Sequence, residues 1–197
     1  MSSIIGHSLT GAFVHGVGNG GKKKGLLWLV WLVILAVAPD FEYVFPLLHK
    51  ANHGGLRVSH SISFACLLPT VTIGMLWLLR ERGRELAVRT IQAYIAGLSH
   101  VALDYLVGVH PMPLLWPFSD ATFRCPSGML PSAGAPSLTN FYFYRNLTIE
   151  LGILLPVYFT VWIAIHRKAW IKSRPALVPL LLGLAIVMLI VSSQLER

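Results

Sequence analysis

The chain has 197 residues, of which 55% are apolar and only 12% are charged. A soluble domain carries about 25% charged residues, so the composition excludes an ordinary soluble domain and predicts one membrane-embedded domain over residues 1–197. The net charge of +8 does not indicate nucleic acid, because the basic residues gather in short clusters beside apolar stretches. Membrane lipid is therefore the expected partner. The clusters are Lys22–Lys24, Arg80–Arg89 and Arg167–Arg174.

The apolar stretches predict an all-α fold, a polytopic helical membrane bundle of about six helices. Most stretches approach the roughly 20 residues that a bilayer requires. The second can continue through Phe41–Leu48, and the fourth is polar enough to face protein rather than lipid. In chain order the expected helices are Ile4–Val17, Gly25–Ala38, Ser61–Leu79, Thr90–Val107, Leu147–Ile165 and Pro175–Ser192.

The three basic clusters fix the expected orientation. With all of them in the cytoplasm, the chain crosses the membrane alternately and the C-terminus lies outside, as does the N-terminus if Ile4–Val17 crosses as a short helix. The proline-rich segment Pro111–Phe143 then forms an extramembrane loop of the kind that often shapes a binding site. Polar residues far apart in the sequence would meet at the outer end of the bundle.

His100 and Asp104 form the sharpest local motif. Residues at i and i+4 share one helix face, so this imidazole and carboxylate can converge on one ion. His110 follows six residues later. The plain alternative is a polar pair that holds two helices together. Neutral imidazole and carboxylate ligands suit zinc, with manganese or iron as further candidates.

Further candidates lie at helix ends on the same predicted side. His7 and His60 are candidate metal ligands, and Asp40 is a ligand or the general base that activates a metal-bound water. Arg57 suits a phosphate oxygen, and Glu150 is a candidate ligand in the fifth helix. Each has a plain structural alternative: a hydrogen-bonded histidine, a solvated helix end, an interfacial arginine or a helix cap.

Taken together, these motifs resemble the LexA-regulated, membrane-bound metal-dependent hydrolase family. The resemblance covers about residues 4–150 and rests on short motifs in a fixed order. That family is distantly similar to zinc-dependent phospholipase C and the zinc-dependent single-strand nucleases. The motifs here are Gly6-His7, Pro39-Asp40-Phe41-Glu42, Ser59-His60-Ser61, His100-x3-Asp104, Gly108 and Pro117-Phe118.

The resemblance implies a bacterial inner-membrane enzyme with divalent ions, two or three in number. Asp104 would bridge two ions, one also held by His60 and His100 and the other by His7. Asp40 would be the water-orienting base, and His110 and Glu150 would help to hold a further ion.

Three departures from the family pattern affect this expectation. Asn146 stands where a histidine of a His-x3-Glu motif is expected, which weakens the case for the third ion. Glu42 replaces the second aspartate of Pro-Asp-x-Asp, and Arg57 lies three residues before His60 instead of four.

The expected function is hydrolysis of a phosphoester, with a phospholipid or another interfacial phosphoester as substrate. The alternative is a non-enzymatic metal-binding or ion-transporting membrane protein. A transporter would place its polar groups near the bilayer midplane, whereas here they gather toward one end.

Overall fold

The computed structural model describes residues 2–18, 25–133 and 139–195. Within these ranges the chain forms seven α-helices and four short 3-10 helices, and it contains no β-strand beyond one isolated bridge between Met112 and Phe123. The α-helices are α1 (Ile4–Gly18), α2 (Leu26–Val37), α3 (Ile62–Leu78), α4 (Gly83–Val107), α5 (Phe141–His166), α6 (Lys168–Ser173) and α7 (Leu177–Ser193). The 3-10 helices are η1 (Ala38–Tyr43), η2 (Pro46–Leu48), η3 (Lys50–His53) and η4 (Val58–His60).

The all-helical fold is as predicted, and the six expected helices correspond to α1 to α5 and α7. The additional helix, α6, is a six-residue turn within the basic segment between α5 and α7. Two boundaries differ from expectation. Helix α4 begins at Gly83, and α5 begins at Phe141, where the Asn140 side chain accepts a hydrogen bond from the Tyr142 amide. The proline-rich loop therefore ends several residues earlier than expected.

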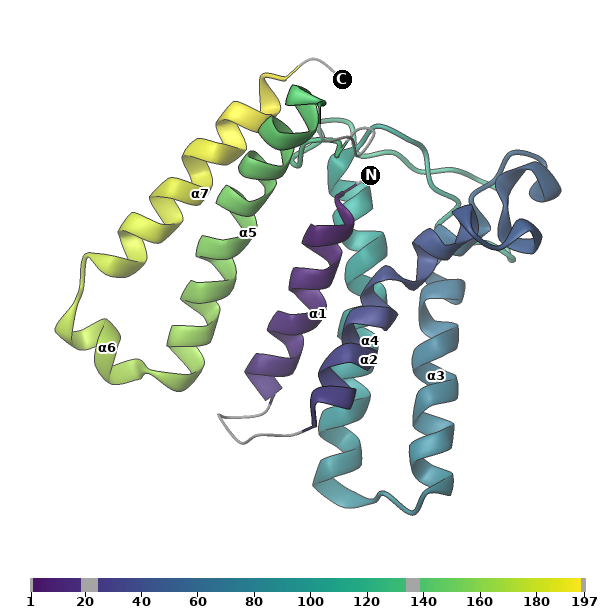
Figure 1. The fold of residues 1–197 in the computed structure, drawn as a ribbon, viewed down its shortest axis with the longest axis horizontal. Helices are drawn as coiled ribbons and strands as arrows, with labels where there is room; N and C mark the ends of the chain where they lie inside the picture. Colours follow the sequence, from purple (N-terminus) through teal and green to yellow (C-terminus); the bar gives the residue numbers. More distant parts are fainter. Residues whose placement is uncertain (1, 19–24, 134–138, 196–197) are drawn as a thin grey trace.

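The long helices run alternately up and down, as the basic clusters predict. The turn between α3 and α4 and the short helix α6 lie at one end of the bundle, and the 3-10 helices and the long loop lie at the other (Figure 1). In the described part of the chain, three helical segments are long and apolar enough to cross a membrane: Leu26–Tyr43, Gly83–Val107 and Phe141–His166. Cluster Lys22–Lys24 lies outside the described residues.

Close helix packing holds α1, α2, α3 and α4 together. Gly11 brings α1 against α2, since a Cβ there would lie 2.8 Å from the Leu32 carbonyl oxygen. Gly97 brings α4 against α3 in the same way, with a Cβ 2.5 Å from the Ala65 carbonyl oxygen. Small residues at helix crossings are typical of membrane bundles, where close backbone approach supplies much of the packing energy.

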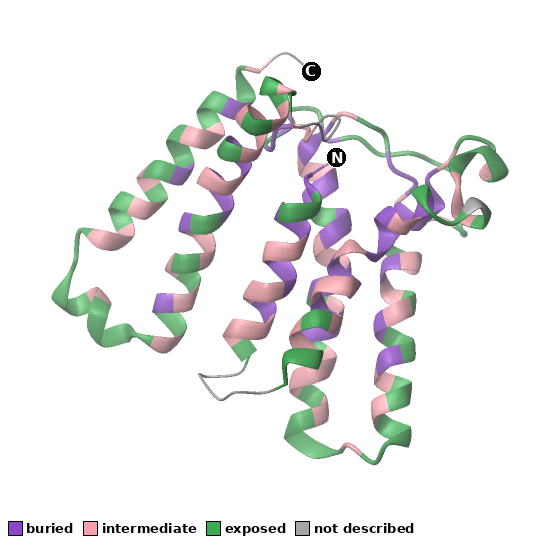
Figure 2. Ribbon diagram, viewed as in Figure 1, coloured by how far each residue is buried: buried purple, intermediate pink, exposed green. Residues whose placement is uncertain are grey.

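The bundle is apolar on its outward faces and polar inside one end. In α7, Leu180 is 71% exposed and Ile186 is 58% exposed, which suits lipid rather than water. Buried residues extend along the facing sides of the central helices and gather at the end that carries the 3-10 helices (Figure 2). The fully buried polar side chains at this end include His7, Ser59, His60, Ser61 and His100.

Candidate metal centre

Three segments bring four potential ligands to one buried point. Helix α2 stops at Val37, and Pro39 lies in the first turn of the 3-10 helix η1, where its missing N–H is tolerated. Asp40 follows directly in η1, while His60 ends η4 just before α3. His100 and Asp104 lie one helical turn apart on the buried face of α4.

The ligand atoms of these four residues all lie within 4.8 Å of one another. His60 Nε2 is 3.3 Å from Asp104 Oδ2 and 3.8 Å from Asp40 Oδ1. His100 Nε2 is 3.8 Å from Asp104 Oδ2 and 3.7 Å from Asp40 Oδ1. The two Nε2 atoms are 3.3 Å apart. We call Asp40, His60, His100 and Asp104 the ligand cluster.

These separations fit one tetrahedral ion. Zinc bonds of about 2.0–2.2 Å place neighbouring ligand atoms roughly 3.3–3.6 Å apart in a tetrahedron, close to the observed 3.3–3.8 Å. Among the described residues, Asp40 Oδ1 and Asp104 Oδ2 have no hydrogen-bond partner although both are buried. Unpartnered buried carboxylate oxygens are costly unless something else satisfies them, and a cation would do so.

Neighbouring groups orient both histidines for ligation. The Nδ1 atom of His100 lies 2.8 Å from the Ala36 carbonyl oxygen, so Nδ1 carries the proton and the lone pair of Nε2 points into the cluster. In His60, Nδ1 lies 2.9 Å from Ser59 Oγ, which itself donates a 2.5 Å hydrogen bond to Glu42. Such outer contacts fix the tautomer of metal-ligating histidines.

Arg57 contacts the ligand cluster from its outer side. Its Nη2 lies 2.7 Å from His60 Nε2, and its Nε donates a 2.6 Å hydrogen bond to Glu42. Burial opposes a charge on His60, but the neighbouring carboxylates of Asp104 and Glu42 raise its pKa above the usual value. The site therefore combines acidic groups, imidazoles and one guanidinium within hydrogen-bonding reach.

His7 lies beside the ligand cluster, against its inner wall. Its ring stacks on His100 with centroids 3.8 Å apart, and its Nε2 is 3.4 Å from Asp104 Oδ1. Neither ring nitrogen has a hydrogen-bond partner among the described residues. The two oxygens of Asp104 thus face two sides: Oδ2 faces the cluster, and Oδ1 faces His7 and the Ser2 amide at 2.7 Å.

Glu150 is buried next to this second side but outside the ligand cluster. Its carboxylate contacts the Ser2 hydroxyl and lies 3.1 Å from the Ser3 amide nitrogen. Gly6 leaves the space for it, since a Cβ there would lie 2.4 Å from Glu150 Oε1. The contact between Ser2 and Glu150 could not be predicted from the sequence, because a single serine forms no motif that pairs it with a distant carboxylate.

His110 does not join the other predicted ligands. Helix α4 ends at Val107, the φ of 65° at the following Gly108 turns the chain away, and His110 is exposed beyond it. It lines a pocket of about 170 Å³ instead. Asn146 also points elsewhere, with its Nδ2 donating to the Ser132 carbonyl oxygen at 2.6 Å. The further ion was expected at His110 and Glu150, with Asn146 as the departure that weakens it, and neither His110 nor Asn146 offers a ligand near Glu150.

The sequence does not predict the contacts of Glu42 or the capping role of Ser61. Glu42 is buried and bridges Arg57 and Ser59, so it acts on His60 from outside the ligand cluster. Ser61 is the residue that caps α3, because its side chain accepts a hydrogen bond from the Phe64 amide. In the sequence, the position of Glu42 near the ligand cluster is indicated by its place two residues after Asp40.

Long apolar helices with a buried His/Asp group at one end define a polytopic membrane protein with a candidate metal centre. A model of the YdjM inner membrane protein family matches residues 1–195. The chain belongs to this family and is an inner membrane protein. Searches of curated proteins and of solved structures find no match to the chain.

Proposed function

We propose that this protein is a metal-dependent hydrolase that cleaves a phosphoester at the lipid–water boundary on the outer membrane face. The observation that carries the proposal is the ligand cluster, in which the imidazole nitrogens lie 3.3 Å from each other and 3.3–3.8 Å from the carboxylate oxygens, and in which buried oxygens lack partners among the described residues. The resemblance to membrane-bound metal-dependent hydrolases supports the same chemistry.

Three of the four residues would hold the ion: His60, His100 and Asp104. A catalytic zinc site typically has three protein ligands. Asp40, whose Oδ1 lies 3.7–3.8 Å from the two Nε2 atoms, would then act beside the ion as the base and would not bond to it. The bound ion would polarise a phosphoryl oxygen and lower the pKa of a bound water to about 7. The second ion expected from the resemblance would be held by Asp104 and His7.

Two side chains of the site could transfer the proton and stabilise the negative charge in such a hydrolysis. The oxygen of a water attacks phosphorus, and the bond from phosphorus to the leaving alcohol oxygen breaks. Asp40 accepts a proton from the attacking water and returns it to the alcohol, so protons balance. Arg57 supplies N–H donors and positive charge where negative charge develops on the phosphoryl oxygens.

The alternative is a protein that binds or transports an ion without hydrolysis. Polar groups near the bilayer midplane would favour transport, but the ligand cluster lies where α2 gives way to η1 and where η4 precedes α3. The position at one end of the bundle favours chemistry on a substrate that enters from the membrane surface.

One experiment tests the proposal and separates it from the alternative. Wild type and Asp104→Ala are purified in detergent, bound metals are quantified by mass spectrometry, and release of phosphate or alcohol from phospholipid substrates is measured. We expect wild type to hold metal and hydrolyse lipid, and Asp104→Ala to lose both. Equal metal content in the two proteins would contradict the site. Metal binding without hydrolysis in wild type would support the ion-binding alternative.

A further inference from the structure

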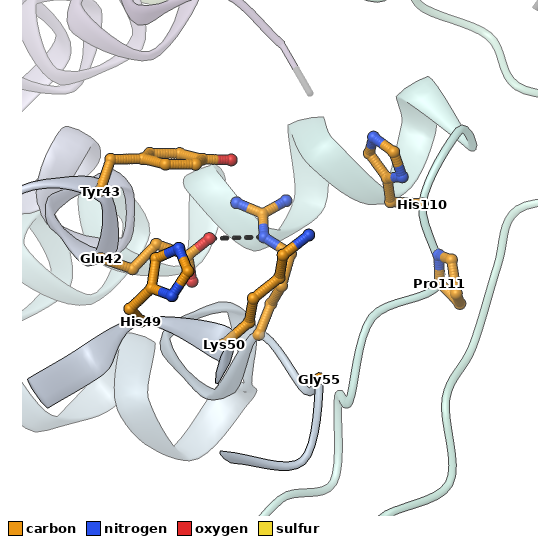
Figure 3. A pocket seen from close by; sticks show the side chains of 8 residues that line it. Glu42, Tyr43, His49, Lys50, Gly55, His110 and Pro111 are labelled. Carbon is orange, nitrogen blue, oxygen red and sulfur yellow. Dashed lines mark hydrogen bonds and ion pairs between the residues drawn. The ribbon is translucent and has the colours of Figure 1, made fainter. Parts of the chain in front are cut away.

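A small polar pocket lies directly outside the ligand cluster. It has a volume of about 170 Å³, below the roughly 300 Å³ of pockets that hold drug-sized ligands. Figure 3 shows Glu42, Tyr43, His49 and Lys50 on one side and His110 and Pro111 on the other. The remaining lining residues are Gly55 and Arg57.

The charge of this pocket is positive. Lys50 and Arg57 contribute two cations, and the only acid among the lining residues is Glu42, which is bound to Arg57 at 2.6 Å (dashed line in Figure 3). Burial lowers the pKa of His110, and nearby positive charges, including those of Arg57 and Lys50, lower it further. The pocket therefore offers hydrogen-bond donors and positive charge, and its volume suits a small anion.

Arg57 is shared between the pocket and the ligand cluster. It lines the pocket, and its Nη2 lies 2.7 Å from His60 Nε2. Because a guanidinium N–H can only donate, the contact between Arg57 and His60 uses the lone pair of His60 Nε2. An ion in the ligand cluster would need the same lone pair. Binding of an ion would thus free the N–H groups of Nη2 for a ligand in the pocket, next to the ion.

The surface beside the pocket suits a lipid. Val44 and Phe45, which follow the lining residue Tyr43, are 71% and 55% exposed, and Leu47 is 80% exposed. Leu47 is linked to η3 because its carbonyl oxygen lies 3.0 Å from His53 Nε2. Exposed apolar side chains next to a cationic pocket favour a ligand with a phosphate head and an apolar tail.

We propose that the pocket between Lys50, Arg57 and His110 binds a terminal phosphate group, carried by an anionic lipid. The inference that the pocket is a substrate subsite rests on the proposed hydrolysis. Phosphate binding in the pocket does not depend on that hydrolysis. Arg57 would donate to the phosphate from the cluster side, and Lys50 would pair with it from the outer side. A non-ester oxygen of the phosphate would then face the ligand cluster, and the ester oxygen with its apolar tail would face the exposed apolar side chains beside the pocket.

The test compares Lys50→Glu with Arg84→Glu, an equal change of charge at an exposed arginine at the other end of the bundle. Binding of inorganic phosphate to the detergent-solubilised proteins is measured by calorimetry, together with bound metal. We expect Lys50→Glu to weaken phosphate binding by roughly tenfold or more, and Arg84→Glu to leave it unchanged, with equal metal content in all samples. His110→Ala, a second change at an exposed lining residue, should also weaken binding.

A second set of measurements identifies the source of the phosphate. Dioleoyl phosphatidic acid and dioleoyl phosphatidylcholine compete with inorganic phosphate in the same assay. Tighter binding of phosphatidic acid than of inorganic phosphate supports the lipid ligand, and equal binding of the two supports free phosphate at the same site. Unchanged phosphate affinity in Lys50→Glu would overturn the inference. Lys50-dependent binding without any hydrolysis would overturn the proposed enzyme activity and leave the binding site in place.

Discussion

The Nε2 atoms of His60 and His100 lie 3.3 Å apart inside the bundle, and both side chains are fully buried. Both imidazoles direct Nε2 inward, because Nδ1 of each is engaged by Ser59 or by the Ala36 carbonyl. Two converging lone pairs repel each other unless a proton or a cation lies between them. An ion in the ligand cluster would therefore stabilise the folded protein, in addition to its role in the proposed hydrolysis.

The first prediction is that zinc stabilises the protein and that His100→Ala removes this effect. Binding to the folded state alone contributes about 2.7 kcal/mol at an ion concentration 100 times the dissociation constant. The thermal midpoint of the wild type, followed by tryptophan fluorescence in detergent, should fall with a chelator and recover with zinc. His53→Ala is a control, since His53 lies in η3 and hydrogen-bonds to the Leu47 carbonyl oxygen in η2. A midpoint of His100→Ala that still rises with zinc would contradict the prediction.

The second prediction separates the roles of Asp40 and Asp104. If Asp40 faces an open coordination position, Asp40→Ala should keep the ion but lose hydrolysis, whereas Asp104→Ala should lose the ion. Asp40→Ala should also cost little stability in chelator, because it removes a buried carboxylate whose Oδ1 has no partner among the described residues. Metal content and hydrolysis are measured on the same preparations. Loss of metal from Asp40→Ala would instead indicate a closed, four-ligand structural site.

The third prediction concerns Glu42, which contacts no ion position directly. Glu42→Gln removes the charge that pairs with buried Arg57 at 2.6 Å, and breaking one partner of a buried pair costs about 3–5 kcal/mol. It also releases Ser59 and His60, so metal affinity should fall by about 10- to 100-fold. Thermal midpoint and zinc titration provide the measurements.

The pair of Glu81 and Arg89 provides a matched control for Glu42→Gln. Its distance is also 2.6 Å, but both side chains are 25% exposed. Glu81→Gln should therefore change stability by less than about 1 kcal/mol and leave zinc affinity unchanged. Similar effects of the two substitutions would show that Glu42 has no special relation to the cluster.

The sequence was sufficient to predict the helices and to place most candidate residues at one end. Apolar runs of near-bilayer length and the alternation of basic clusters are local signals, and α1, α3 and α7 end within two residues of the predicted boundaries. The i, i+4 spacing of His100 and Asp104 also predicted their shared face, because helix geometry fixes it.

Contacts that depend on irregular backbone could not be predicted in this way. The spacing from Asp104 to His110 suggested a shared site, but Gly108 ends α4 with a left-handed turn and redirects the chain. The pairing of Glu42 with Arg57 depends on how η1 and η4 pack, which no periodicity encodes. The Asn146 side chain binds the loop carbonyl of Ser132, a contact that only the folded loop reveals.

The last prediction tests whether the packing of α3 against α4 positions the ligand cluster, using two glycine substitutions. Helix α4 carries His100, and η4 delivers His60 just before α3, so their distance depends on this interface. A Cβ at Gly97 would lie 2.5 Å from the Ala65 carbonyl oxygen and 2.9 Å from Pro69 Cγ. Gly97→Ala should therefore cost about 1–3 kcal/mol and weaken zinc binding.

Gly74→Ala is the matched control in α3, because a Cβ there meets nothing within 4 Å among the described residues. Replacing a helix-interior glycine by alanine without a clash should raise stability by about 0.5–1 kcal/mol. The midpoints of the two variants should therefore move in opposite directions, with zinc affinity reduced only in Gly97→Ala. If Gly97→Ala keeps wild-type zinc affinity despite a lower midpoint, the approach of α3 to α4 contributes to the fold but does not set the geometry of the cluster.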